Sequence, residues 1–385
     1  KKEQMDLQFE TFIDPSTGKT EKRPKRVPAL ITYKIGRTAY TKNPDDADLE
    51  RIAKIVSLPI PKDLPTDRFP DCQMTRVGRM KTTNSAAVHL MFLPRAAHAM
   101  AMLWNNANSH SEPRTRSMLL FMVEQAIWGM STLARYTPTH FSQVNQYLSG
   151  VYYVASQLSE CSPWYILNGK LGRLSKAFQK YQAIPQNSAI NTGTAARLPV
   201  LDGSIDYIFT DPPFGENIYY SDLNFLVESW HGVKTDSDPE AIVDRVREKG
   251  IPEYQHLMYS CFAEYYRVLK PGRWMTVVFS NSKAAVWNTI QVALQQTGFV
   301  VAEVTALDKK QGSFQQVMSP NTVKQDLVIS VYKPNGGLED RFKKHGATVD
   351  SAWDFVQTHL RNLSVVKTRA GELEFIVERD PRRIF

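Results

Sequence analysis

The stretch Ile205-Asp206-Tyr207-Ile208-Phe209-Thr210, followed by Asp211-Pro212-Pro213-Phe214-Gly215, decides the fold of this chain. Its first five residues carry large apolar groups and few charges, which is typical of a strand buried on both faces. Proline lacks the N–H that a central strand needs, so we expect the strand to end at Thr210. Asp211 then lies at the carboxyl end of that strand, where open α/β sheets bind their ligands.

The two prolines also suggest a chemistry for this position. They remove two backbone donors and leave rigid, unpaired carbonyl acceptors beside the carboxylate of Asp211. Such a site suits a group with two N–H donors, for example an exocyclic amine of a nucleobase. If Asp211 and the Pro212 carbonyl held both hydrogens, the nitrogen lone pair would point at an electrophile, and the carboxylate would stabilise the developing positive charge. Phe214 offers a flat face on which a base could stack.

The same residues carry a family resemblance. Asp211-Pro212-Pro213-Phe214 matches the (Asp/Asn/Ser)-Pro-Pro-(Tyr/Phe) motif of S-adenosylmethionine-dependent amino-methyltransferases, and the run 210–224 resembles large bacterial adenine-specific DNA methylases. The resemblance implies a Rossmann-like class I methyltransferase α/β fold with a helical insert, truncated at both ends. It implies methylation of adenine N6 in double-stranded DNA, with the target base flipped out. A proline turn after a core strand is the alternative interpretation.

The resemblance also assigns roles to residues. Asp211, Pro212, Pro213 and Phe214 would be catalytic, and Tyr219 and Tyr220 would bind the substrate base. S-adenosyl-L-methionine would be the cofactor, with Gly193, Thr194 and Asp211 as its contacts. The run Gly193-Thr194-Ala195 stands where the family commonly has Gly-Asp-Ala, and a threonine hydroxyl can still form a hydrogen bond.

The other half of a cofactor site is harder to find. A nucleoside cofactor in this fold needs a glycine-rich turn directly after a buried strand. Asn168-Gly169-Lys170-Leu171-Gly172 lacks a preceding apolar strand, and Gly336-Gly337 lies in a linker. We therefore expect this turn upstream of Lys1, and expect the chain itself to hold the half of the site that binds the target amine.

Composition narrows the class of protein. The chain has 385 residues and a net charge of +8, from 47 Lys+Arg against 39 Asp+Glu, which suits a polyanionic partner bound in a salt-sensitive way. The basic run 19–26 is a candidate for phosphate contact. Cys72, Cys161 and Cys261 form neither a metal motif nor a disulfide framework, so we expect no metal and a reducing compartment. No apolar run reaches membrane-spanning length, so we expect a cytoplasmic protein without a membrane partner.

Four segments are predicted: an irregular, basic N-terminal region (1–84), a helical insert with a linking strand (85–190), the catalytic core half (191–335), and a C-terminal linker and helix (336–385). Residues 57–84 are expected to be irregular. Strands are predicted at 28–35, within 145–154, and at 205–210, 274–281, 299–306 and 326–332, the last two antiparallel. Helices are predicted at 45–56, 96–106, 114–136, 174–181, 218–231, 236–250, 254–269, 287–296 and 349–363.

Two further positions and three other functions stay open at this point. Arg95 could touch cofactor or DNA, and the long polar connection 308–316 could contact nucleic acid. The same chemistry could act on RNA or on cytosine N4. A protein of another class, a non-catalytic DNA-binding module that kept the fold, also fits the missing glycine turn.

Overall fold

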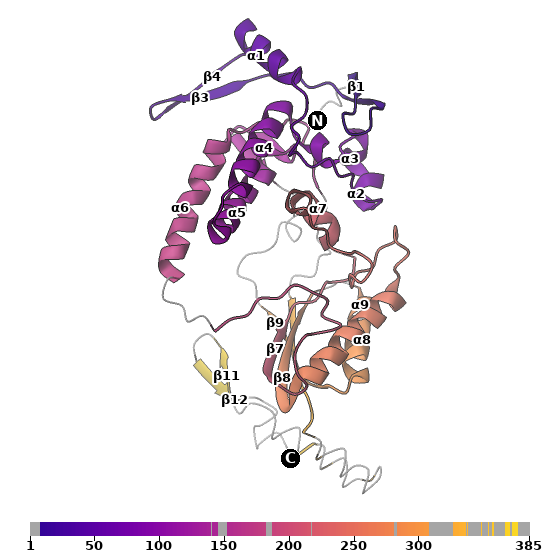
Figure 1. Ribbon diagram of the computed structural model, residues 1–385. Coiled ribbons are helices and arrows are strands. Elements are labelled where there is room, and N and C mark those ends of the chain that lie inside the picture. Colours follow the sequence, from indigo (N-terminus) through magenta and orange to yellow (C-terminus); the bar gives the residue numbers. More distant parts are fainter. Residues whose placement is uncertain are drawn as a thin grey trace. The chain divides into compact units, whose positions relative to one another are not determined.

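The computed structural model describes residues 8–139, 141–144, 152–181, 187–216, 218–280, 283–307 and 326–335, with short pieces up to residue 375. The chain divides into two compact units (Figure 1). Unit 1 is Lys1–Ser188 with Tyr219–Ser237, and unit 2 is Ala189–Ile218 with Asp238–Phe385. The chain therefore passes from unit 2 to unit 1 and back shortly after the Asp-Pro-Pro-Phe motif. The predicted four-segment division stays a prediction.

Unit 1 consists mainly of helices and two-stranded hairpins. The hairpins are β1 (Phe9–Ile13) with β2 (Thr20–Pro24), β3 (Ile31–Ile35) with β4 (Thr38–Lys42), and β5 (Ala134–Thr137) with β6 (Phe141–Val144). The helices are α1 (Asp46–Val56), α2 (Gln73–Arg76), α3 (Gly78–Thr82), the 3-10 turn η1 (Val88–Met91), α4 (Pro94–Asn108), α5 (Pro113–Met130), α6 (Pro163–Tyr181) and α7 (Tyr220–His231). Its core includes the fully buried side chains of Met91, Met100, Ile127 and Leu226.

Unit 2 is built on a four-stranded mixed sheet in the order β7-β8-β10-β9. β7 (Ile205–Thr210) runs parallel to β8 (Leu269–Phe279), while β10 (Asp326–Tyr332) runs antiparallel between β8 and β9 (Val300–Leu307). α8 (Ile251–Val268) and α9 (Ala284–Gln296) accompany the sheet, and a short hairpin joins β11 (Val366–Arg369) to β12 (Glu372–Phe375). Phe262, Met275 and Ile290 belong to one apolar core formed by the helices and strands.

Several predicted elements are confirmed. β7 ends at Thr210, before the prolines, as expected. α1 begins after Asp45, whose side chain caps the helix by accepting from the Asp48 N–H. β9 and β10 pair antiparallel as predicted. The α/β class of the core is confirmed by the parallel β7–β8 pair and by the α8 helix, which lies between these strands in the sequence.

The burial of β7 differs from the prediction. Its side chains are not buried on both faces, because Tyr207 is 54% exposed and Phe209 is 64% exposed. Tyr207 and Phe209 are two residues apart and therefore lie on the same face of the sheet, and their exposure shows that this face of β7 is not covered within the described residues. An apolar strand pattern reports what a strand can bury, and here one set of apolar side chains faces solvent.

The predicted helix over 236–250 is also wrong. The backbones of Asp244 and Lys249 hydrogen-bond to each other in both directions and close a tight loop. Glu248 within this loop has φ +56°, which an α-helix cannot contain. The charged side chains of this segment therefore lie on a loop and not on a surface helix.

Other boundaries moved for local reasons. The helix predicted to reach residue 136 ends at Met130, because the Thr132 N–H is taken by the Met91 carbonyl (2.7 Å), and β5 begins soon after. α6 starts at Pro163, earlier than predicted, with the proline in the first turn where its missing N–H costs nothing. Residues 57–84 are not wholly irregular, since they contain α2 and α3. α8 ends at Val268, close to the predicted end at 269, whereas β8 begins at Leu269, earlier than the predicted start at 274.

Some predictions fall on other parts of the chain. Residues 152–154 form no strand, and the remainder of the segment 145–154 lies outside the described residues. The connection 308–316 and most of the helix predicted at 349–363 also lie outside them. Within the described residues no helix is long and apolar enough to cross a membrane.

Candidate active site

The Asp-Pro-Pro-Phe segment leaves the carboxyl end of β7. Thr210 pairs with Val277 of the parallel strand β8, and the chain then leaves the sheet. Asp211 is exposed, and the next residue, Pro212, is buried. Gly215 ends the segment with φ +76°, a conformation that favours glycine. The exposure of Asp211 is what a carboxylate needs in order to meet a substrate amine.

Two hydrogen bonds, one of them from α8, hold this segment in place. The buried Tyr254 hydroxyl donates to the Pro213 carbonyl at 2.7 Å, and the Val243 N–H donates to the Gly215 carbonyl at 3.3 Å. The expectation that the carbonyls near the prolines are unpaired is therefore wrong for Pro213, whose carbonyl is used to hold the turn. The acceptor proposed for the amine, the Pro212 carbonyl, is one residue earlier.

Phe214 packs against Phe279 in the apolar core of unit 2. Its ring meets that of Phe279, at the end of β8, in a T-shaped contact with centroids 5.3 Å apart. Phe214 is half-buried and packs against the apolar core of unit 2. The ring is thereby fixed in orientation. Its predicted stacking on a base stays a prediction.

A cavity of about 530 Å³ opens beside the end of the motif segment. Its lining is mixed, with charged side chains of both signs and an apolar floor: Glu216, Val243, Arg245, Glu248, Lys249, Gly250, Ile251, Lys283, Ala285 and Val286. Its volume lies in the range of small-molecule sites. The lining begins at Glu216, five residues after Asp211, so the carboxylate at the end of β7 is not itself one of the lining residues.

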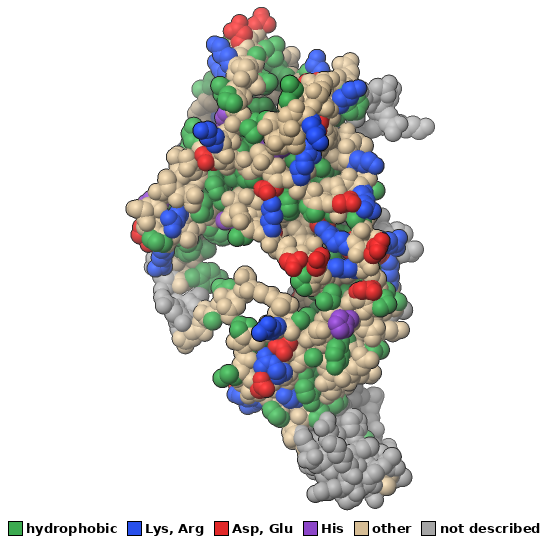
Figure 2. Space-filling view, turned by 45° about the vertical axis from the view of Figure 1, so that its right-hand side comes forward, with side chains coloured by type: hydrophobic (Ala, Val, Ile, Leu, Met, Phe, Trp, Pro, Cys, Tyr) green, Lys and Arg blue, Asp and Glu red, His purple; other side chains and the backbone are tan. Residues whose placement is uncertain are grey.

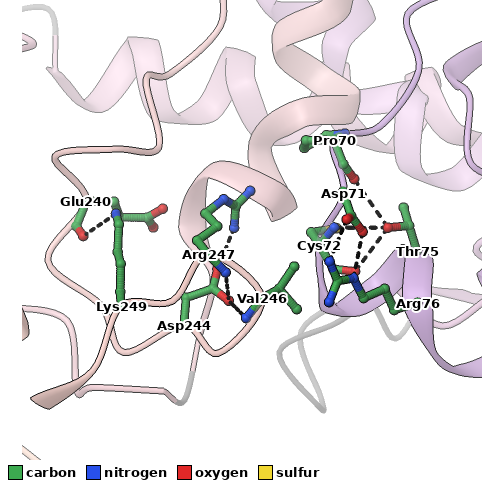
Figure 3. A network of polar contacts seen from close by, with 10 residues as sticks. All are labelled: Pro70, Asp71, Cys72, Thr75, Arg76, Glu240, Asp244, Val246, Arg247 and Lys249. Carbon is green, nitrogen blue, oxygen red and sulfur yellow. Dashed lines mark hydrogen bonds and ion pairs between the residues drawn. The ribbon is translucent and has the colours of Figure 1, made fainter.

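Ion pairs organise the rim of this cavity. Glu216 pairs with Lys283, and an Arg245 nitrogen lies 3.8 Å from the Glu216 carboxylate. The fully buried Asp244 holds the neighbouring loop, because its carboxylate accepts from the Val246 N–H (2.8 Å) and from the Arg247 guanidinium (2.6 Å), as Figure 3 shows. The loop is therefore rigid where it meets the cavity.

Acidic and basic side chains lie side by side over much of the face drawn in Figure 2. In unit 2, Arg267 contacts Glu264 (2.8 Å) and Lys270 contacts Asp206 (2.9 Å). Arg267 also donates to the carbonyls of Leu198 and Val200, which fixes the segment leading into β7. Hydrogen bonds from Arg267 are the main cause that lowers the pKa of Glu264 to about 2.

Two of the three residues predicted to contact the cofactor, Gly193 and Thr194, lie in this leading segment. Gly193 and Thr194 are both exposed. The Thr194 hydroxyl accepts from the Ala196 N–H at 3.2 Å, and a Cβ added at Gly193 would meet nothing within 4 Å. Gly193 therefore does not line a cradle that only a glycine would fit.

Tyr219 and Tyr220 lie in unit 1, at the start of α7, whereas Asp211 to Phe214 lie in unit 2. Tyr219 is buried, and Tyr220 is 42% exposed. Buried Leu223, Leu226 and Trp230 anchor the helix in unit 1, as the sequence predicted. The substrate role of the two tyrosines stays a prediction.

Comparison with known proteins identifies the part of the chain that carries the motif. Residues 205–370 match the model of the N6/N4 DNA methylase family. The resemblance to DNA amino-methyltransferases is thereby confirmed for this segment, which begins at the first residue of β7. No curated protein matches the chain.

Among solved structures, the chain is similar to a DNA modification methylase of Thermus thermophilus in complex with S-adenosyl-L-methionine, with 15% identity, 38% of this chain and 55% of that one covered, and a TM-score of 0.24. It is also similar to the PvuII cytosine-N4-specific DNA methyltransferase, with 16% identity, 37% and 48% covered, and a TM-score of 0.26. The chain spans about half the length of these methylases.

The described residues do not fit the whole of the implied cofactor. Gly193 and Thr194 stand on an exposed turn, and the described part of unit 2 shows no glycine-rich turn after a buried strand. The polar groups at the end of β7 are hydrogen-bond acceptors, which suit an amine. The described residues of unit 2 thus fit the amine side of a methyl transfer better than its cofactor side.

Sequence reasoning missed two features of this site. Tyr254 was expected only as the first residue of a helix, and nothing local indicates that its hydroxyl reaches Pro213, 41 positions away. The pair between Glu216 and Lys283 joins residues that are 67 positions apart.

Among the described residues no group of His, Cys, Asp or Glu is placed to hold a metal ion.

Proposed function

We propose that the chain is an S-adenosylmethionine-dependent DNA methyltransferase acting on an exocyclic amine, with adenine N6 as the target. The observation that carries the proposal is the exposed Asp211 at the carboxyl end of β7, on a proline segment fixed by Tyr254, within a segment matching the DNA methylase family. The substrate would be double-stranded DNA with the target base flipped out of the helix, since the amine of a paired and stacked base is not accessible to Asp211.

The chain's own residues explain how an amine is made reactive. The Asp211 carboxylate and the Pro212 carbonyl accept the two N–H hydrogens, which draws the lone pair out of conjugation with the base. The carboxylate stabilises the positive charge that grows on the nitrogen, and this interaction is stronger in the transition state than in the ground state. The Phe214 ring, fixed by Phe279, supports the base from one side.

Mutation of Asp211 to asparagine tests this role. Because Asp211 is exposed, Asp211→Asn should leave folding intact while lowering methyl transfer by about 100-fold or more, the cost typical of losing one electrostatic group of a preorganised site. Asp206→Asn is the matched control, since Asp206 lies near the start of β7, at the end opposite to the motif, and pairs with Lys270. Retained activity in Asp211→Asn would refute the role of the carboxylate.

The same assay decides which amine is methylated. Transfer of labelled methyl groups is measured on duplex DNA, and the digested nucleosides are separated by mass spectrometry. We expect N6-methyladenine. N4-methylcytosine, or transfer to RNA alone, would replace the adenine assignment while keeping the amine chemistry.

A non-catalytic DNA-binding module is the second candidate, favoured by the exposed turn at Gly193 and Thr194. Calorimetry with S-adenosylmethionine separates the two. Binding by the full-length protein supports the enzyme. Heat signals that stay at the level of dilution with millimolar cofactor would reject the enzyme and leave the binding module.

A further inference from the structure

The basic residues of the chain are concentrated at its N-terminal end. Residues 19–42 contain eight Lys and Arg residues and one acidic residue, Glu21, which gives this segment a net charge of +7. The net charge of the whole chain is +8. This segment covers β2, the connection that follows it, and the β3–β4 hairpin of unit 1.

Some of these charges serve the fold. Arg23 pairs with Glu10 at 2.7 Å, and Lys42 pairs with Asp45 at 2.8 Å. Glu21, the single acid of the segment, contacts Arg68 at 2.9 Å and thus ties β2 to the rest of unit 1. These contacts hold the basic segment against the rest of unit 1, and they do not involve Lys22, Lys25, Lys34 or Arg37.

These four cations lie on β2, in the connection that follows it, and on the β3–β4 hairpin. Lys34 is exposed on β3, and Arg37 is exposed in the two-residue turn with Gly36, whose φ is +61°. Lys22 and Lys25 are also exposed. A segment with several exposed cations and a single acid is a footprint for a polyanion.

The hairpin also carries exposed aromatic rings. Tyr33 pairs with Tyr40 across the strands, and the two rings stack with centroids 5.6 Å apart. They are 40% and 43% exposed, and Ile35 on the same face is 66% exposed. Both strands are almost wholly exposed, so the hairpin is not built to cover a core. In Figure 1 it extends from the helices of unit 1 as a narrow ribbon.

We propose that the β3–β4 hairpin is a DNA-binding ribbon. Lys34 and Arg37, with Lys22 and Lys25, contact backbone phosphates, while the Tyr33–Tyr40 face lies against the sugars and base edges of a groove. A two-stranded ribbon is narrow enough to enter the major groove of duplex DNA. The choice of DNA as the polyanion rests on the proposed function. The charge alone favours a polyanion over a protein partner for the same exposed face.

The experiment measures binding of the full chain to a fluorescein-labelled duplex by anisotropy, at several salt concentrations. Lys34→Gln with Arg37→Gln should weaken binding about tenfold and reduce the dependence of log K on log salt by roughly 2, because each lost phosphate contact lowers that slope by about 0.9. Arg173→Gln with Lys176→Gln is the matched control. It removes the same two residue types from exposed positions of α6.

A second variant tests the aromatic face. Tyr40→Thr keeps a good strand former at this position and should weaken binding several-fold without changing the salt slope, since no charge is removed. Tyr40→Thr with unchanged affinity would reject the role of the ring. Equal salt slopes for the hairpin double variant and the wild type would overturn the proposal. So would a change of oligomeric state in the double variant with DNA affinity unaltered, because the hairpin would then serve a protein interface.

Steady-state kinetics separate this proposal from the proposed function. The hairpin double variant should raise KM for DNA and keep kcat, whereas Asp211→Asn should lower kcat and keep DNA binding. If Asp211→Asn stays active while the hairpin variant loses affinity, the amine chemistry fails and the ribbon stands. If the hairpin variant binds normally while Asp211→Asn is inactive, the ribbon fails and the enzyme stands.

Discussion

Removing the hydroxyl group of Tyr254 tests whether α8 holds the Asp-Pro-Pro-Phe segment in its active shape. The hydroxyl donates to the Pro213 carbonyl at 2.7 Å, and Tyr254 is fully buried. Tyr254→Phe leaves the ring in place and the carbonyl without this donor. A neutral hydrogen bond contributes about 0.5–1.5 kcal/mol, and a buried acceptor left unpaired costs about 1–3 kcal/mol, so we expect the free energy of unfolding to fall by about 1–2 kcal/mol.

The same change should reduce methyl transfer. The Pro212 carbonyl, one residue before Pro213, must accept an amine hydrogen, and a shift of about 1 Å in a reacting geometry costs on the order of 100-fold in rate. Because the buried Pro212 limits how far the segment can move, we expect a smaller loss, of about tenfold in kcat at saturating DNA. The assay is single-turnover methyl transfer, with urea denaturation of the same samples.

Lys333→Met is the control for this prediction. Lys333 donates to the carbonyls of Tyr266 (2.7 Å) and Leu269 (2.8 Å), so its removal also leaves backbone acceptors without a donor. Leu269 pairs with Ile205, at the end of the β7–β8 pair opposite to the motif. Lys333→Met should lower stability and spare kcat. A Tyr254→Phe protein that loses stability but keeps its kcat would refute the argument that α8 positions the acceptors.

Two predictions concern stability. Asp14 is fully buried and accepts hydrogen bonds from Arg68 (2.8 Å) and His89 (3.1 Å). Asp14→Ala should therefore destabilise unit 1 by about 3 kcal/mol, which is at the low end for a broken buried ion pair because Arg68 is partly exposed. An unchanged urea midpoint would contradict this prediction. Hydrogen bonds from Arg267 lower the pKa of Glu264 to about 2 from an ordinary value of 4.5, so the stabilising effect of this carboxylate is complete above pH 4.5 and is lost as the pH falls toward 2. The difference in unfolding free energy between the wild type and Glu264→Gln should therefore shrink between about pH 5 and pH 3, and a constant difference would show that the pair contributes nothing.

The sequence predicts features that short-range chemistry determines. The end of β7 follows from the missing N–H of proline, and the start of α1 follows from the capping side chain of Asp45. The position of Asp211 on the lip of a strand follows from the same proline rule. The local sequence is therefore sufficient to predict the position of the candidate amine site.

Features that depend on distant partners could not be predicted in this way. The exposure of Tyr207 and Phe209 depends on whether another element covers their face of β7, which the residues of the strand do not encode. The loop at 236–250 has the charge pattern of a surface helix, yet the buried Asp244 and its contact with Arg247 impose a tight turn. In both cases a tertiary contact outweighs the local preference.

The path of the chain links the two proposals. The chain leaves unit 2 for unit 1 between Ile218 and Tyr219, shortly after Phe214, and returns between Ser237 and Asp238. The segment in between contains α7, whose Leu226 and Trp230 are buried, so only a few residues of chain separate the motif from the unit that carries the basic hairpin. A short tether raises the effective concentration of anything held by one unit at the other. A duplex that the hairpin holds would therefore stay available to Asp211 between encounters, which is why the hairpin variant should change KM and the Asp211 variant should change kcat.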